Sequence, residues 1–207
     1  MKVAEVEIGT AGPSGFLQVL RYDREPLEGG LLERLHQEDF CQALGIPPEL
    51  KYQQEGGPNL KQCFDLVRAV SSVPGPDVLR LFDAVVFNYL IGNNDAHGKN
   101  FSFLHDHGVA GIAPLYDLVC TQAYPGLAAE VAMKIGGERR PDRISARNWL
   151  KFFKDAGVGP AVARKRLEGL AQNVMKIVRG MDESDAGWKS VAPVILGNCA
   201  RLLSLGE

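Results

Sequence analysis

Five polar residues that could carry out chemistry lie close together in the middle of the sequence: Asp95, His97, Lys99, Asn100 and Asp117. The first four directly follow a long apolar segment, where dense polarity is unfavourable unless the groups are used. A carboxylate base followed by an amide and a second carboxylate is the set that phosphoryl transfer needs around a Mg²⁺-nucleotide. We therefore predict that Asp95 is the catalytic base and that Asn100 and Asp117 are the metal ligands.

The neighbouring polar residues have a structural interpretation as well as a functional one. His97 is expected either to hydrogen-bond a phosphate or to hold the loop, and Lys99 either to contact phosphate or to face solvent. Tyr116 is expected under the nucleotide, although an aromatic residue at a strand end is more often part of the core. Zinc is the weaker alternative, because no cysteine or further histidine joins His97, His105 and His107 at the usual ligand spacing.

Two elements are predicted to position these groups. Residues 77–91 are apolar nearly all round, which is typical of a buried central helix, and Gly92 is suited to end it. Phe101–Leu104, a polar turn and Val109–Leu115 then predict a β-hairpin. Because a hairpin returns its two ends to one place, Asn100 and Asp117 are expected to meet.

The rest of the chain predicts mostly helices. Alternation over residues 3–22 indicates a hairpin that joins a larger sheet or lies against the helical body, followed by a polar connector over 23–30. A short strand is expected over Glu130–Ile135, a solvated loop over 138–143 and a linker over 180–188. Helices are expected over 37–44, 60–70, 145–157, 160–178 and 191–203.

Composition limits the class of protein. The 207 residues contain 45% hydrophobic and 23% charged residues, which is typical of one large soluble domain. A formal net charge of −2 gives no general electrostatic reason to bind nucleic acid or an anionic membrane. The four cysteines are scattered and are expected to be buried reduced thiols. We find no secretory signal and no apolar run long enough for a membrane span, so a cytoplasmic protein is expected.

Two phosphate-binding motifs are missing from the sequence. There is no Gly-x-x-x-x-Gly-Lys-Ser/Thr word, which excludes a Walker-type NTPase. There is also no Gly-x-Gly-x-x-Gly loop followed by a strand lysine, since Gly12–Gly15 is too short and Lys134 lies after the site. The catalytic and metal-binding half of a kinase site is therefore predicted without the half that grips phosphate.

Several long words show a resemblance to a family. They are Val-Leu-Arg-Tyr-Asp-Arg (19–24), Leu-His-Gln-Glu-Asp-Phe-Cys-Gln-Ala-Leu-Gly (35–45), Lys-Tyr and Gly-Gly-Pro (51–58), Phe-Asn-Tyr-Leu-Ile-Gly-Asn-Asn-Asp-Ala-His-Gly-Lys-Asn-Phe-Ser (87–102), Pro-Leu-Tyr-Asp-Leu (114–118) and Met-Lys-Ile-Gly-Gly-Glu (133–138). In this order they resemble the HipA-type bacterial serine/threonine-protein kinases, the toxin half of a toxin–antitoxin pair. The resemblance extends from about Val3 to about Ala171.

The resemblance implies a fold and a set of site residues. It implies an α+β, mainly helical, protein-kinase-like large lobe over 25–207, preceded over 1–24 by a remnant of the small-lobe sheet and the hinge. Asp95 matches the catalytic aspartate, and Asn100 and Asp117 match the Mg²⁺ ligands. His97 and Tyr116 match the nucleotide site, and Tyr22 matches the hinge aromatic near adenine. Leu20 stands where the family often has Glu.

The resemblance also implies ligands and partners. ATP and Mg²⁺ are expected, with a protein substrate that in this family is typically an aminoacyl-tRNA synthetase. A helix-turn-helix antitoxin of HipB type is expected as a partner, and operator DNA only indirectly through it. The family's amino-terminal subdomain, Gly-rich loop and phosphate-binding lysine are missing from these 207 residues, so weak ATP binding by the isolated chain is expected. Apolar surface exposed by their absence also predicts a homodimer or a swapped hairpin.

Two other functions remain open from the sequence. Without the lysine and the Gly-rich loop, the lobe could be catalytically dead and serve only to bind an antitoxin or another partner. The spacing Asp95-x-His97-x-x-Asn100 also resembles lipid-kinase catalytic loops. That second resemblance leaves a phosphotransferase acting on small molecules or lipids as a third hypothesis.

Overall fold

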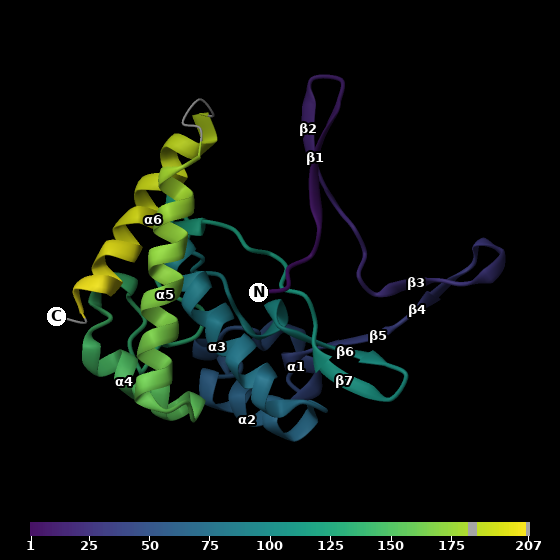
Figure 1. Ribbon diagram of the computed structural model, residues 1–207, viewed down its shortest axis with the longest axis horizontal. Helices are drawn as coiled ribbons and strands as arrows, with labels where there is room; N and C mark the ends of the chain where they lie inside the picture. The colour runs from purple at the N-terminus through teal and green to yellow at the C-terminus, as the bar shows by residue number, and fades with distance from the viewer. Residues whose placement is uncertain (182–185, 206–207) are drawn as a thin grey trace.

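Helix α3 lies at the centre of the helical body and is the element on which the others pack (Figure 1). The computed structural model describes residues 1–181 and 186–205. Helices α2, α5 and α6 all contact α3, and α4 packs on α2 and α5. The helices are α1 (Phe40–Ala43), α2 (Leu60–Val70), α3 (Pro74–Ile91), α4 (Ala146–Ala156), α5 (Pro160–Arg179) and α6 (Ala186–Ser204).

Aromatic side chains fill the space between α2, α3 and α4. The rings of Phe82 and Phe152 are fully buried and stack with their centroids 5.0 Å apart. Phe64 packs on Phe152 from α2, at 5.9 Å between centroids. A fully buried phenylalanine stabilises a fold by about 1.5–3 kcal/mol, so this cluster is a main reason why α3 stays rigid.

Helix α3 begins earlier than the sequence pattern predicts. The Pro74-Gly-Pro76 segment does separate α2 from α3, but Pro74 is already the first residue of α3 rather than part of a break before Asp77. Proline is tolerated in the first turn, where its missing N–H would have no helical partner. The helix then ends at Ile91 with Gly92 as its C-cap, as predicted.

A three-stranded antiparallel sheet borders the helical body. Its strand order is β5–β6–β7, and Asp39 faces Ser102 across the first pair. The predicted helix over 37–44 is therefore wrong in its first part, because residues 36–39 form β5 and only Phe40–Ala43 is helical. Pairing with β6 outweighs local helix propensity there, and Asp39 then caps α1 by accepting a bond from Gln42 N at 2.9 Å. The strands are β5 (His36–Asp39), β6 (Ser102–Asp106) and β7 (Val109–Ile112).

Two hairpins project from the amino-terminal part (Figure 1). The predicted hairpin forms as β1 (Val6–Ala11) and β2 (Ser14–Val19). The alternative that it lies against the helical body is wrong, and among the described residues its strands pair only with each other. Both strands are almost wholly exposed, with Ile8 at 88%. The base is tied to the body by a bond from Ala4 N to Leu115 O at 2.8 Å. The predicted connector over 23–30 instead contains half of a second hairpin, β3 (Arg24–Pro26) with β4 (Leu32–Arg34).

Two further segments differ from expectation. The strand expected over Glu130–Ile135 does not form; Ile135 makes only an isolated bridge with Glu138. Residues 182–185 of the expected 180–188 linker lie outside the described residues, and α6 already begins at Ala186. All four cysteines are buried and free, as predicted.

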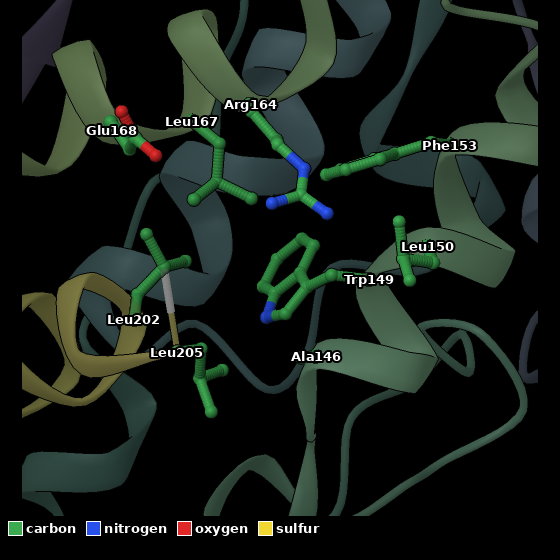
Figure 2. A pocket seen from close by; sticks show the side chains of 9 residues that line it. All are labelled: Ala146, Trp149, Leu150, Phe153, Arg164, Leu167, Glu168, Leu202 and Leu205. Atoms are coloured by element: carbon green, nitrogen blue, oxygen red, sulfur yellow. The ribbon is translucent and has the colours of Figure 1, made fainter. Parts of the chain in front are cut away.

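A small apolar pocket of about 50 Å³ lies between α4, α5 and α6 (Figure 2). The indole of Trp149 lies in its wall, and its buried Nε1 has no hydrogen-bond partner among the described residues. Across residues 1–181 and 186–205, every helix is too short or too polar to cross a lipid bilayer. With its helices and small sheets, the chain has the α+β, mainly helical fold that was expected.

Candidate active site

The turn after α3 holds Asp95 in place. Gly92 adopts a left-handed conformation (φ 73°) that ends the helix, and a Cβ there would lie 2.9 Å from Val194 Cγ1 on α6. The chain therefore turns sharply against α6 and presents Asp95 at the end of a rigid, buried helix. The side chain of Asp95 is 48% exposed, so its carboxylate is open to a reacting group.

Asn93 connects Asp95 to the other side of the site. Its side-chain Nδ2 donates to Asn88 Oδ1 at 2.8 Å and to the backbone oxygen of Asp117 at 3.0 Å. Its Oδ1 accepts a bond from the backbone N–H of Asp95 at 3.1 Å. Asn93 is only 5% exposed, so water does not compete for these bonds. One amide thus fixes the backbone positions of Asp95 and Asp117 relative to α3.

Asn94 fastens the segment that follows Asp117. Its backbone N–H donates to Thr121 Oγ1 at 2.8 Å, and its side-chain Nδ2 donates to Ala128 O at 2.9 Å. Its backbone oxygen accepts from Ala132 N at 2.8 Å. The segment 121–132 forms no strand, and these hydrogen bonds with Asn94 hold it beside the turn that carries Asp95.

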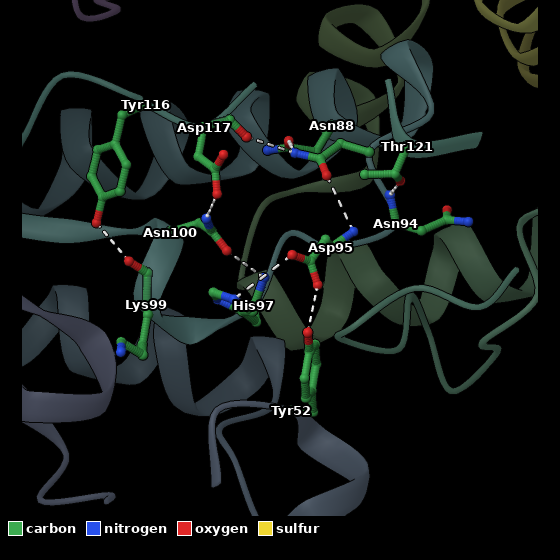
Figure 3. Close-up of polar contacts among 11 residues, drawn as sticks. Tyr52, Asn88, Asn94, Asp95, His97, Lys99, Asn100, Tyr116, Asp117 and Thr121 are labelled. Atoms are coloured by element: carbon green, nitrogen blue, oxygen red, sulfur yellow. Dashed lines mark hydrogen bonds and ion pairs between the residues drawn. The ribbon is translucent and has the colours of Figure 1, made fainter. Parts of the chain in front are cut away.

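Asn100 and Asp117 meet, as the hairpin predicts. Asn100 Nδ2 donates to Asp117 Oδ2 at 2.5 Å, while Asn100 Oδ1 accepts from the backbone N–H of His97 at 3.0 Å (Figure 3). Asn100 ends the short 3₁₀-helix Gly98–Asn100 and is buried, whereas Asp117 is exposed. Asp117 has a φ of 57°, a left-handed conformation that is unusual for a residue other than glycine and is found often at functional sites.

Tyr52 is a partner of Asp95 from a distant part of the chain. Its hydroxyl donates to Asp95 Oδ1 at 2.8 Å (Figure 3). Burial, together with this bond to Asp95, raises the pKa of Tyr52 to about 12. The phenol therefore stays protonated at neutral pH and remains a donor, which fixes the rotamer of the carboxylate.

His97 packs behind Asp95 and does not bond to it. Its Nε2 lies 4.0 Å from Asp95 Oδ2, beyond hydrogen-bond distance, and its ring contacts the ring of Tyr52 edge-on. Burial, with the positive charge of Lys51, lowers the pKa of His97. The imidazole is therefore neutral, and its buried Nδ1 has no hydrogen-bond partner within the described part of the chain. The loop is held by the backbone N–H of His97, which donates to Asn100 Oδ1, and this bond does not involve the imidazole.

Tyr116 and Tyr22 form the aromatic side of the site. Their rings stack with centroids 6.5 Å apart, so the structure brings both predicted nucleotide-site aromatics together. The hydroxyl of Tyr116 donates to the backbone oxygen of Lys99 at 2.6 Å and lies 2.6 Å from Ser102 Oγ. The side chain of Lys99 points away from Asn100 and Asp117 in Figure 3, so the structure does not bring its ammonium group to the predicted metal ligands.

Sequence reasoning missed several residues that build the site: Tyr52, Asn88, Asn93, Asn94 and Ser102. The amides of the pair Asn93–Asn94 are the one local signal that could have found them, because they directly precede Asp95. Tyr52 gives no such signal, since it lies 43 residues before its partner.

Asn100 and Asp117 carry the types of donor atom that suit Mg²⁺, but in the structure Asn100 turns its amide nitrogen, and not its oxygen, toward Asp117. Asn100 and Asp117 offer oxygen atoms, which hard divalent cations prefer. Asn100 Oδ1 accepts one bond from His97 N–H and keeps a second lone pair, and the Asp117 carboxylate is exposed enough to admit a cation.

Comparison with known families and proteins identifies the family. The family described as HipA-like C-terminal domain matches residues 1–179, and the chain belongs to this family. The protein Y4mE of Sinorhizobium fredii is 49% identical over 178 residues, covering 86% of this chain and 42% of Y4mE. The serine/threonine-protein kinase toxin HipA of Shewanella oneidensis is 29% identical, over 98% of this chain and 51% of that protein. The chain thus spans about half the length of these relatives.

Solved structures show the same fold. The Shewanella oneidensis HipA in complex with HipB and operator DNA superimposes with a TM-score of 0.91 at 28% identity, covering 99% of this chain and 53% of HipA. The Helicobacter pylori proinflammatory kinase CtkA superimposes with a TM-score of 0.64 over 99% of this chain and 75% of CtkA. At 14% identity the second likeness concerns the fold alone, which is the expected kinase-like α+β fold.

Proposed function

We propose that this chain is the catalytic large lobe of a HipA-like serine/threonine-protein kinase that transfers the γ-phosphate of ATP to a protein hydroxyl. The observation that carries the proposal is the set of hydrogen bonds from the Asn93 side chain to Asp95 and Asp117, here called the Asn93 clamp. In addition, Asn100 contacts the Asp117 carboxylate directly. Phosphoryl transfer depends on this kind of positioning more than on covalent chemistry by the protein.

In this proposal Asp95 orients and accepts the proton of the substrate hydroxyl. Its Oδ1 is held by Tyr52, which leaves Oδ2 for the hydroxyl. Asn100 and Asp117 hold Mg²⁺, which when bound offsets negative charge on the ATP phosphates. Neutral His97 supports the loop that carries Asn100.

The nucleotide is proposed to lie against Tyr22 and Tyr116, whose stacked rings offer an apolar face to a base. The Gly-rich loop and the phosphate-binding lysine would come from polypeptide outside these 207 residues, which accords with relatives of about twice this length. Residues 1–24 are proposed to belong to the small lobe and 25–207 to the large lobe. The exposed apolar side chains of β1 and β2 support this division, because a larger small-lobe sheet would cover them.

The protein substrate is proposed to enter through a pocket of about 480 Å³ that Asp95 and Tyr52 line together. Lys134 supplies positive charge on its wall, whereas Arg139 and Glu130 form an ion pair with each other there at 2.6 Å. A HipB-type antitoxin is proposed as a partner, because the Shewanella HipA that superimposes on this chain was solved with HipB and operator DNA. An aminoacyl-tRNA synthetase remains the substrate expected from the family resemblance.

Phosphate transfer from labelled ATP tests the proposal. The assay uses this chain together with the polypeptide that supplies the small lobe, whether in the same chain or as a separate subunit, and follows label in the protein itself and in added protein substrates. Asp95→Ala is expected to slow transfer at least about 100-fold. Asp65→Ala is the matched control, because Asp65 is exposed on α2 and only forms surface ion pairs there. Transfer that persists unchanged in Asp95→Ala would contradict the proposal.

A further inference from the structure

A second cluster of chemically capable side chains lies on the three-stranded sheet. In the β5–β6 register, His36 faces His105 directly. Glu38 lies two residues along β5 and so on the same face as His36. Residues 69 apart in sequence are thus brought together, which no spacing in the chain would indicate.

This cluster lies on the face of the sheet that does not carry the proposed nucleotide contacts. Gln37, which alternates with His36 and Glu38, donates from its amide to Ser102 Oγ at 3.2 Å, and Ser102 contacts Tyr116. Side chains alternate along a strand, so the histidines face the other way. The cluster is therefore separate from Asp95, Asn100 and Asp117.

The donor atoms already lie close to one another. One nitrogen from each histidine and one carboxylate oxygen of Glu38 all lie within 4.8 Å of one another. His105 Nε2 is 3.7 Å from Glu38 Oε2, too far for a hydrogen bond, and the two imidazole centroids are 5.1 Å apart.

His105 Nε2 is also buried without any hydrogen-bond partner among the residues that the structure describes. A buried polar atom without a partner needs an explanation, and a bound ion is one of the recognised ones. His105 Nε2 lies beside the carboxylate of Glu38 and the imidazole of His36, so it is placed where a metal ligand would be.

We propose that His36, Glu38 and His105 form a Zn²⁺ site. Two imidazoles and one carboxylate, with water in the fourth position, are a common zinc ligand set. Zinc–ligand bonds of about 2.0–2.2 Å place tetrahedral ligands roughly 3.3–3.5 Å apart, so the 3.7 Å pair needs only a small adjustment. His36 is exposed and free to turn toward it. The imidazoles distinguish this site from the all-oxygen Mg²⁺ site, because hard cations disfavour nitrogen.

A neighbouring cluster supplies an internal comparison. Glu25 and Glu33 face each other across β3–β4, and His107 lies 3.8 Å from Glu25. Their donor atoms also lie within 4.8 Å of one another. Only one imidazole belongs to this cluster and His107 is exposed, so it is the poorer zinc ligand set.

Zinc titration of the 207-residue chain tests the proposal. The protein is prepared without a polyhistidine tag and stripped of metal, and binding is measured by competition with a chromophoric chelator. One zinc per chain is expected. His105→Ala, His36→Ala and Glu38→Gln are each expected to weaken binding by more than about 100-fold, since loss of an outer-sphere partner alone costs 10–100-fold. His107→Ala is the matched control and is expected to bind like the wild type.

Two further readouts keep the test decisive. Circular dichroism of each variant checks folding, and if His105→Ala unfolds, zinc binding by the exposed His36→Ala variant decides the question. X-ray absorption of the zinc-loaded chain is expected to show two imidazoles. Three results would each overturn the proposal. They are no zinc binding by the wild type, wild-type affinity in both His36→Ala and His105→Ala, and loss of binding in His107→Ala.

Discussion

Replacing Asn93 with alanine is expected to destabilise the chain substantially. The substitution removes three hydrogen bonds at a position that is 5% exposed. A typical bond contributes about 1 kcal/mol net, so the three together give about 3 kcal/mol. Water cannot replace them without opening the turn after α3, so the partner groups on Asn88, Asp95 and Asp117 would be left unsatisfied.

Urea denaturation of the 207-residue chain measures this effect. With a slope of about 2–3 kcal/mol/M, a loss of 3 kcal/mol lowers the midpoint by about 1–1.5 M. Asn173→Ala, on the exposed face of α5, is the matched control and is expected to stay within about 0.5 kcal/mol of the wild type. Asn93→Asp keeps the shape and the bond from Asp95 N–H but loses both donors, so it is expected to destabilise as well. If the urea midpoint of Asn93→Ala equals that of the control, the hydrogen bonds of Asn93 do not stabilise the site and the reasoning is refuted.

Two other predictions concern single side chains. Tyr52→Phe removes the donor to Asp95. In the phosphate-transfer assay proposed above it is expected to lower kcat about 5-fold, equivalent to roughly 1 kcal/mol, with KM for ATP unchanged. An unchanged kcat would rule out an orienting role. Arg21, aided by Arg24, lowers the pKa of Asp23 from 3.8 to about 2. The folded chain thus binds this proton more weakly than the unfolded chain, so the stabilisation is present above about pH 4 and is lost as pH falls toward 2. Asp23→Asn is expected to flatten the acid limb of the stability–pH curve measured by urea denaturation, and an unaltered limb would contradict this.

Local patterns predicted the parts of the site that are close in sequence. The apolar surface of residues 77–91 indicated α3, and the strand–turn–strand signal after Phe101 brought Asn100 to Asp117, because both depend on neighbouring residues. The helix expected over 37–44 failed because β5 is a strand only by virtue of its pairing with β6. Four residues of strand followed by four of helix leave no periodicity that distinguishes them from one helix.

The contacts that hold the site could not be predicted from spacing. Tyr52 reaches Asp95 across 43 residues, and Asn93 reaches Asp117 across 24. Such pairs depend on how the loop before α2 and the segment after the hairpin fold back on α3. His36 likewise meets His105 only because β5 and β6 pair, which is why the zinc ligand set was incomplete in the sequence.

Separating ATP binding from phosphate transfer tests the central claim most directly. This chain, together with the polypeptide that supplies the small lobe, is titrated with Mg²⁺-ATP by calorimetry, and single-turnover transfer is measured on the same preparations. Asp95→Ala is expected to bind Mg²⁺-ATP like the wild type but to transfer phosphate at least about 100-fold more slowly. Asp117→Ala is expected to lose Mg²⁺-dependent binding itself. Normal transfer by Asp95→Ala, or normal Mg²⁺-ATP binding by Asp117→Ala, would contradict the assignment of these two carboxylates.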